Sequence, residues 1–135
     1  MDILEVCVSA IKEKFPDVVG IWLFGSTATG SDVAGSDVDL AILSNGNIER
    51  VELWHFAQLI ARKIGKDIDI VDLLPASTVL RAQVVRNGQR IYCADKLKCD
   101  TFETEALTDY LRFSEQRHEL LKDIESRGKV FGDGR

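Results

Sequence analysis

The sequence predicts an α/β domain in which a small sheet is flanked by helices. Short apolar runs rich in β-branched and aromatic residues alternate with longer segments whose apolar residues recur every three or four positions. A length of 135 residues with 45% apolar and 29% charged residues fits one globular domain with its own core. The formal net charge of −5 argues against direct binding to nucleic acid, which depends on clustered lysine and arginine.

The N-terminal part of the chain is expected to form a helix and two strands. Apolar residues spaced by three or four predict a helix over residues 2–15, which Pro16 ends. The apolar run 19–24 predicts a buried strand. Glycines and small polar residues over 25–36 predict a tight turn and a flexible loop. Residues 37–43 alternate in polarity and therefore predict a second strand.

The middle of the chain continues this alternation of helices and strands. Residues 67–74 predict a third strand, and 90–93 a short last one. Pro75 is expected to open a helix that runs to about residue 86 and is capped by Asn87-Gly88. Between the second and third strands lies a predicted helix over 48–65, whose apolar stripe is Val51, Trp54, Ala57, Ile60 and Ile64.

A long helix over residues 102–126 completes the predicted fold. Its apolar stripe is wide enough to pack on the domain and also to present a face to a partner, and both roles are open at this point. Aromatic residues and arginine contribute strongly to interfaces, so candidate anchors for a partner are Tyr110, Phe113, Arg112 and Arg117.

These elements divide the chain into three parts. We expect residues 1–95 to form the core and 96–126 a helical extension of the same domain. Residues 127–135, which hold further glycines, are expected to be a flexible tail.

Cysteine usage and hydropathy indicate a cytoplasmic protein that does not bind membranes. Cys7, Cys93 and Cys99 are an odd number of cysteines with no C-x-x-C pair, which favours free thiols in a reducing compartment. With two histidines in the chain, a zinc site is not expected. The sequence shows no secretory signal and no apolar stretch near the ~20 residues that span a bilayer.

One motif carries most of the functional information. Gly25-Ser26 follows the first predicted strand, and after ten residues Asp37-Val38-Asp39 opens the second. A glycine lets the backbone approach a phosphate closely, and Ser26 adds a hydroxyl donor. Residues i and i+2 of a strand point the same way and lie about 6.6 Å apart, so both aspartates can face one or two metal ions.

A third acid on a neighbouring strand would complete the metal site. We choose Asp69, which lies in the middle of the third predicted strand between Ile68 and Ile70, where a carboxylate without a ligand is costly. Asp67 shares its face but lies at the mouth of the strand, and Asp72 faces the other way. Two metals about 3.5–4 Å apart can bind both the entering and the leaving oxygen of an in-line displacement.

Each part of this motif alone has a simpler explanation, as an ordinary turn or a solvated strand edge. Their spacing on a strand–turn–strand–helix–strand outline favours a nucleotide site instead. Residues 25–31 read G-x-x-x-x-G-S, but a P-loop requires lysine after its second glycine, and here Ser31 takes that position. The G-x-G-x-x-G pattern of dinucleotide-binding folds is absent.

With Asp69 included, the motif resembles the signature of the minimal nucleotidyltransferase (MNT) proteins of the DNA polymerase β-like superfamily. The resemblance covers roughly residues 18–93. It implies a small mixed sheet flanked by helices, with ATP and Mg²⁺ as cofactors. It further implies that Gly25 and Ser26 hold the triphosphate, that Asp37 and Asp39 bind metal, and that Asp69 binds the second metal and helps to deprotonate the attacking hydroxyl.

Similar small proteins are the antitoxins of HEPN/MNT toxin–antitoxin pairs. That resemblance implies that AMP is transferred to a tyrosine of a HEPN ribonuclease toxin, which is thereby silenced. Two alternatives remain open: an adenylyltransferase for a small molecule of the aminoglycoside type, and an antitoxin that only masks its toxin. Arg112 and His118 echo the R-x4-6-H-x-Y motif of the toxins, but Leu120 replaces its tyrosine, so a solvated helix face explains them better.

Overall fold

The computed structural model describes residues 2–25 and 37–133, with side chains described as far as Arg127. Four strands and four helices alternate along this part of the chain. They are α1 (Ile3–Lys14), β1 (Val18–Phe24), β2 (Val38–Ser44), α2 (Arg50–Ile64), β3 (Ile68–Asp72), α3 (Thr78–Asn87), β4 (Gln89–Cys93) and α4 (Lys96–Asp133).

The strands form one mixed sheet in the order β3-β2-β1-β4. β1 is antiparallel to both β2 and β4, whereas β2 and β3 are parallel and are joined through α2. The expected small mixed sheet flanked by helices is therefore confirmed. β3 and β4 are its edge strands in the part of the chain that is described.

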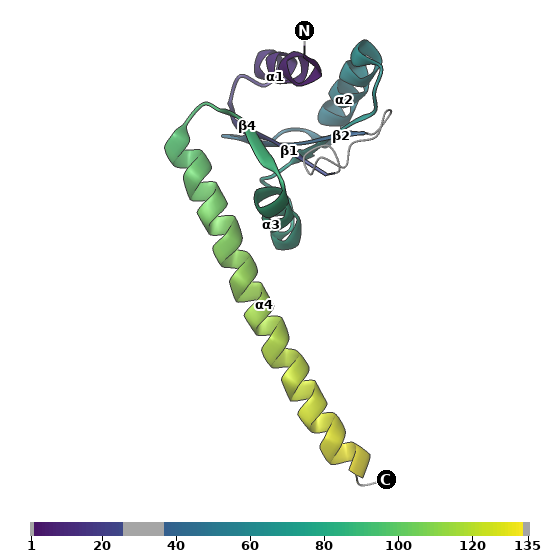
Figure 1. Cartoon of the computed structure of the whole chain (residues 1–135), viewed down its shortest axis with the longest axis vertical. Coiled ribbons are helices and arrows are strands. Elements are labelled where there is room, and N and C mark those ends of the chain that lie inside the picture. Colours follow the sequence, from purple (N-terminus) through teal and green to yellow (C-terminus); the bar gives the residue numbers. More distant parts are fainter. Residues whose placement is uncertain (1, 26–36, 134–135) are drawn as a thin grey trace.

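The sheet lies between two helical layers (Figure 1). α1 and α2 cover one face, and α3 with the start of α4 covers the other. Alternation along the strands sends side chains to both layers: Leu40 and Ile42 pack toward α2, while Ala41 packs with Trp22 and Val84 on the opposite face. In both β2 and β3, side chains therefore point to the face of the sheet that the alternation predicted.

α2 buries only part of the predicted stripe: Ala57 and Ile60 are in the core as expected, but Val51 and Trp54 are not. Its buried residues are Leu53, Phe56, Ala57 and Ile60. Val51 and Trp54, which we assigned to the core stripe, are 57% and 59% exposed. Apolar residues occupy more than half of this helix surface, so periodicity alone could not decide which stripe faces the sheet.

α3 begins later than predicted. Pro75 lies in the preceding loop, and the helix starts at Thr78 because the Ser77 side chain accepts a hydrogen bond from the Leu80 N–H. At its other end Gly88 is the C-cap, as predicted: its N–H donates to the Val84 carbonyl, and its φ is −93°. A Cβ there would lie 2.3 Å from the Val84 carbonyl oxygen, so close backbone packing requires glycine at this position.

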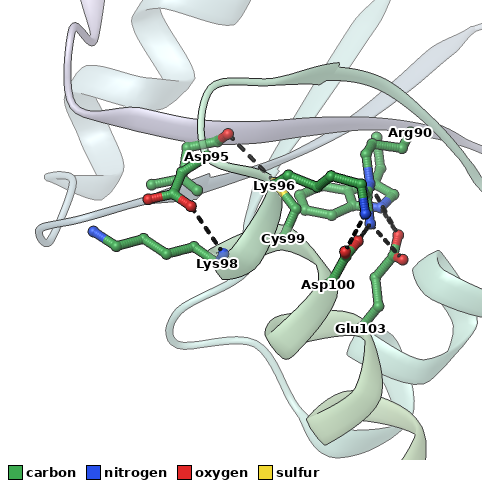
Figure 2. Close-up of polar contacts among 9 residues, drawn as sticks. Arg90, Asp95, Lys96, Lys98, Cys99, Asp100 and Glu103 are labelled. Carbon is green, nitrogen blue, oxygen red and sulfur yellow. Dashed lines mark hydrogen bonds and ion pairs between the residues drawn. The ribbon is translucent and has the colours of Figure 1, made fainter.

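α4 is longer at both ends than the predicted helix 102–126. It starts at Lys96 because Asp95 caps it: its carboxylate accepts from the Lys98 N–H at 3.2 Å, and its carbonyl accepts from the Cys99 N–H (Figure 2). The helix continues to Asp133, through Gly128 and Gly132 of the segment that we expected to be a flexible tail. A glycine inside a helix costs about 0.5–1 kcal/mol relative to alanine, which weakens a helix without ending it.

An ion-pair cluster attaches the base of α4 to the sheet (Figure 2). Arg90 of β4 donates to Asp100 Oδ1 and to Glu103 Oε1, both at 2.7 Å. The Trp22 indole N–H donates to Glu103 Oε2 at 2.9 Å. These charge-assisted bonds join two strands to α4, and they raise the pKa of Arg90 further above its ordinary value.

Beyond its first turns α4 extends away from the domain (Figure 1). Cys99 and Ala106 are buried, and Tyr110 lies under the Arg86 guanidinium of α3 at 5.6 Å. Farther along, a group of apolar side chains is exposed: Leu111, Phe113, Leu120, Leu121 and Ile124. Along the described residues, no helix is both long and apolar enough to cross a membrane.

Candidate active site

Three chain segments meet at one end of the sheet. β1 ends at Phe24 and leads into Gly25, while β2 begins beside it with Val38. Asp39 is the register partner of Phe24 on one side and of Asp69 in β3 on the other. Because paired residues of neighbouring strands point to the same face, Asp39 and Asp69 lie side by side next to the β1 turn.

Gly25 is required by the backbone and by its contact with Asp39. Its φ is +78°, in the left-handed region that favours glycine. A Cβ at this position would lie 2.2 Å from Asp39 Oδ2. The turn and the carboxylate are thus packed directly against each other, so a molecule bound at one also meets the other.

The electrostatics of the site favour a bound cation. The pKa of Asp39 is raised, first by burial and then by the nearby charges of Asp69 and Asp37. All three aspartates therefore interact, although Asp37 and Asp69 are exposed and Asp39 is half-buried. Carboxylates held together against their mutual repulsion are a usual feature of sites that bind divalent metals.

The donor set fits magnesium shared with a substrate. Carboxylate oxygens are the hard ligands that Mg²⁺ prefers. Within the described residues, no three acidic, histidine or cysteine side chains are placed to hold one ion by themselves. Mg²⁺ commonly binds one or two carboxylates and takes its remaining ligands from substrate phosphates and water, so this arrangement suits an ion that arrives with a nucleotide.

The three candidate acids of the third strand lie in different places. Asp69 is the second residue of β3 and is exposed, so the reason we gave for choosing it, a costly buried carboxylate, is wrong. Its register with Asp39 is a better reason. Asp67 precedes β3, and its carbonyl accepts from the Val38 N–H at 2.9 Å. Asp72 ends the strand on the other face and accepts from the Leu74 N–H.

Part of the predicted site lies outside the described residues. Ser26 and the predicted loop up to residue 36, including most of the G-x-x-x-x-G-S segment, belong to this part. The triphosphate role of Ser26 therefore stays a prediction, as do the roles assigned to Gly25, Asp37, Asp39 and Asp69.

Sequence reasoning missed a groove next to Asp69. It has a volume of about 500 Å³ and runs along β3 between α2 and the loop that leads to α3. Its walls include Asp69, Arg50, Trp54, Pro75 and Leu80. No signal in the sequence pointed to it, because we had assigned Trp54 to the core stripe of α2, whereas its side chain is exposed.

Comparison with known proteins agrees with this geometry. Residues 7–97 match the model of the polymerase beta nucleotidyltransferase family. The protein adenylyltransferase MntA of Shewanella oneidensis is 29% identical over 117 residues, which are 87% of this chain and 84% of that protein.

Two solved structures share the fold over almost the whole chain. A toxin–antitoxin complex with AMP-PNP has a TM-score of 0.81 at 27% identity, and the match covers 92% of this chain and 98% of that one. A tri-AMPylated Shewanella oneidensis HEPN toxin in complex with its MNT antitoxin has a TM-score of 0.76 at 26% identity, covering 90% and 95%. With a matched segment that includes Gly25 and all three aspartates, this chain belongs to the polymerase beta nucleotidyltransferase family.

Proposed function

We propose that this protein is an antitoxin that transfers AMP from ATP to a tyrosine hydroxyl of a cognate HEPN ribonuclease toxin and thereby neutralises it. The observation that carries the proposal is the register of Asp39 with Asp69 beside the Gly25 turn. The relatives support it: one is a protein adenylyltransferase, and another is an antitoxin in complex with an AMPylated HEPN toxin.

The proposed reaction is an in-line displacement at the α-phosphorus of ATP. The tyrosine oxygen forms a bond to this phosphorus, the bond to the bridging oxygen breaks, and pyrophosphate leaves. Asp69 accepts the proton of the hydroxyl, and Gly25 and Ser26 hold the triphosphate. Mg²⁺ shared between the ATP phosphates and the carboxylates of Asp37, Asp39 and Asp69 would neutralise the charge that develops on the phosphate oxygens. ATP as the donor is supported by the AMP-PNP in a similar complex, and it fits the expected cytoplasmic location.

The direct test is the mass of the toxin after incubation with this protein, ATP and Mg²⁺. We expect the toxin to gain whole AMP units and to lose its ribonuclease activity in step with that gain. Omitting Mg²⁺ should stop both changes, because the carboxylates then repel the triphosphate instead of binding it through metal.

A matched variant separates catalysis from masking. Asp37→Asn combined with Asp39→Asn removes two metal ligands and should still bind the toxin. If this variant adds no AMP but protects cells as well as the wild type does, the protein acts by masking. If an aminoglycoside gains AMP and the toxin does not, the acceptor is a small molecule and the proposal is wrong.

A further inference from the structure

The groove next to Asp69 follows an open edge of the sheet. β3 is the last strand on its side among the described residues, and the groove runs along its whole length from Ile68 to Asp72. An edge strand offers backbone N–H and C=O groups to an extended segment of another chain. The groove is therefore shaped for an extended peptide.

The walls of the groove are mostly apolar, and the carboxylates of Asp69 and Asp72 lie along β3. Trp54 is 59% exposed on the α2 side. Ala76 and Leu80 form the opposite wall, beyond Pro75. Apolar walls that contain an aromatic ring suit a second aromatic ring, and a carboxylate at the same site can accept a hydrogen bond from a phenolic hydroxyl. This is the chemistry that recognises tyrosine.

The groove and the candidate active site share one residue. Asp69 lines the groove and is also the register partner of Asp39. A tyrosine bound in this groove with its ring against Trp54 would lie beside the strand that carries Asp69, the acid proposed to take its proton. The groove for the acceptor and the metal-binding carboxylates then lie on two neighbouring strands, β2 and β3.

We infer that the groove between α2 and β3 receives an extended, tyrosine-bearing segment of the toxin, with Trp54 as the main wall for the tyrosine ring. This inference rests on the proposed function. The volume of about 500 Å³ lies within the range of specific ligand sites, about 300–1,000 Å³. Trp54 is thus a specificity-determining residue for the acceptor, and it has no part in binding ATP.

The first test compares two exposed residues of the same helix. Trp54→Ala removes the aromatic wall, whereas Leu59→Ala alters a residue of nearly equal exposure, 60%, that does not line the groove. We expect kcat/KM for the toxin to fall about tenfold or more in Trp54→Ala, as at an aromatic interface anchor, and to stay at the wild-type value in Leu59→Ala. Ala76→Trp, which fills the groove, should act like Trp54→Ala. The Kd for AMP-PNP should be unchanged in all three.

The second test does not depend on transfer of AMP. A benzophenone amino acid is placed at Gln58, which lines the groove, or at the neighbouring Leu59, which does not. After illumination with the toxin, position 58 should crosslink to a tyrosine-containing toxin peptide and position 59 should not. This result would uphold the docking inference even if the wild type transferred no AMP, in which case only the proposed function would fail.

Three outcomes would overturn the inference. One is a wild-type kcat/KM for the toxin in both Trp54→Ala and Ala76→Trp, which would leave the proposed function intact. Another is a higher Kd for AMP-PNP in Trp54→Ala than in the wild type, because this would show that the groove holds the nucleotide. The third is a crosslink from position 58 to a toxin peptide without tyrosine.

Discussion

Replacing Gly25 by alanine tests whether the position of Asp39 matters for catalysis. The new methyl group would lie 2.2 Å from Asp39 Oδ2, although such contacts are essentially never shorter than 3.0 Å. The carboxylate or the turn must therefore move by about 1 Å, and a misplacement of this size in an active site costs about 100-fold in rate. Alanine at φ +78° also carries the strain of the left-handed region, about 1–2 kcal/mol.

Gly65→Ala is the matched control for this substitution. Gly65 has φ +73°, so the backbone strain is the same, but a Cβ there would meet no atom within 4 Å. Both variants should lose about 1–2 kcal/mol of unfolding free energy in urea titrations. Only Gly25→Ala should lose about 100-fold in the initial rate of AMP transfer to the toxin. Equal rates for the two variants would refute the assignment of Asp39 to the active site.

Three further predictions concern the acids and the attachment of α4. Because the pKa of Asp39 is raised in the folded state, the folded protein binds this proton more tightly than the unfolded chain, so stability falls as the pH rises above the unfolded value of about 3.9. Asp39→Asn should therefore stabilise the metal-free protein at pH 7 by at most about 1 kcal/mol, with no gain near pH 3. Urea midpoints at the two pH values test this, and a loss of stability at pH 7 would contradict it. Asp69→Asn should abolish AMP transfer while Asp67→Asn keeps it, as intact-mass measurements of the toxin can check. The reverse result would make Asp67 the third acid. Arg90→Met should lower the unfolding free energy by about 1–2 kcal/mol, since it leaves two carboxylates without their shared donor. Lys96→Met, at a side chain that is 83% exposed, should leave the urea midpoint unchanged, and equal losses would argue against the Arg90 cluster.

The sequence was sufficient to predict the sheet and its acidic face. Alternation in residues 37–43 and 67–74 put Asp39 and Asp69 each on the correct side of its strand, because that choice depends only on a period of two. The pairing of Asp39 with Asp69 could not be predicted from alternation, because it depends on how β3 returns beside β2 after α2. The groove was missed for a related reason: it lies between elements that are distant in the sequence.

The helices show where local patterns become ambiguous. On α2, Leu53 and Trp54 are adjacent, and only the position of the sheet determines that the first is buried and the second exposed. The start of α4 was missed because Lys96, Lys98 and Asp100 form a polar stretch without a core stripe. The capping bond of Asp95 and the ion pair of Arg90 with Asp100 hold this first turn in place, and neither follows from an apolar period.

The parallel pairing of β2 with β3 also limits how such a site can change over evolution. Deleting Ile68, the one residue of β3 before Asp69, would turn this acid to the opposite side of the sheet if the strand kept its starting point. The product is not a slightly weaker version of the original. Insertions in the loops on either side of α2 leave both the pairing and the buried residues of the helix intact, so the loop surface can change while the acids keep their register.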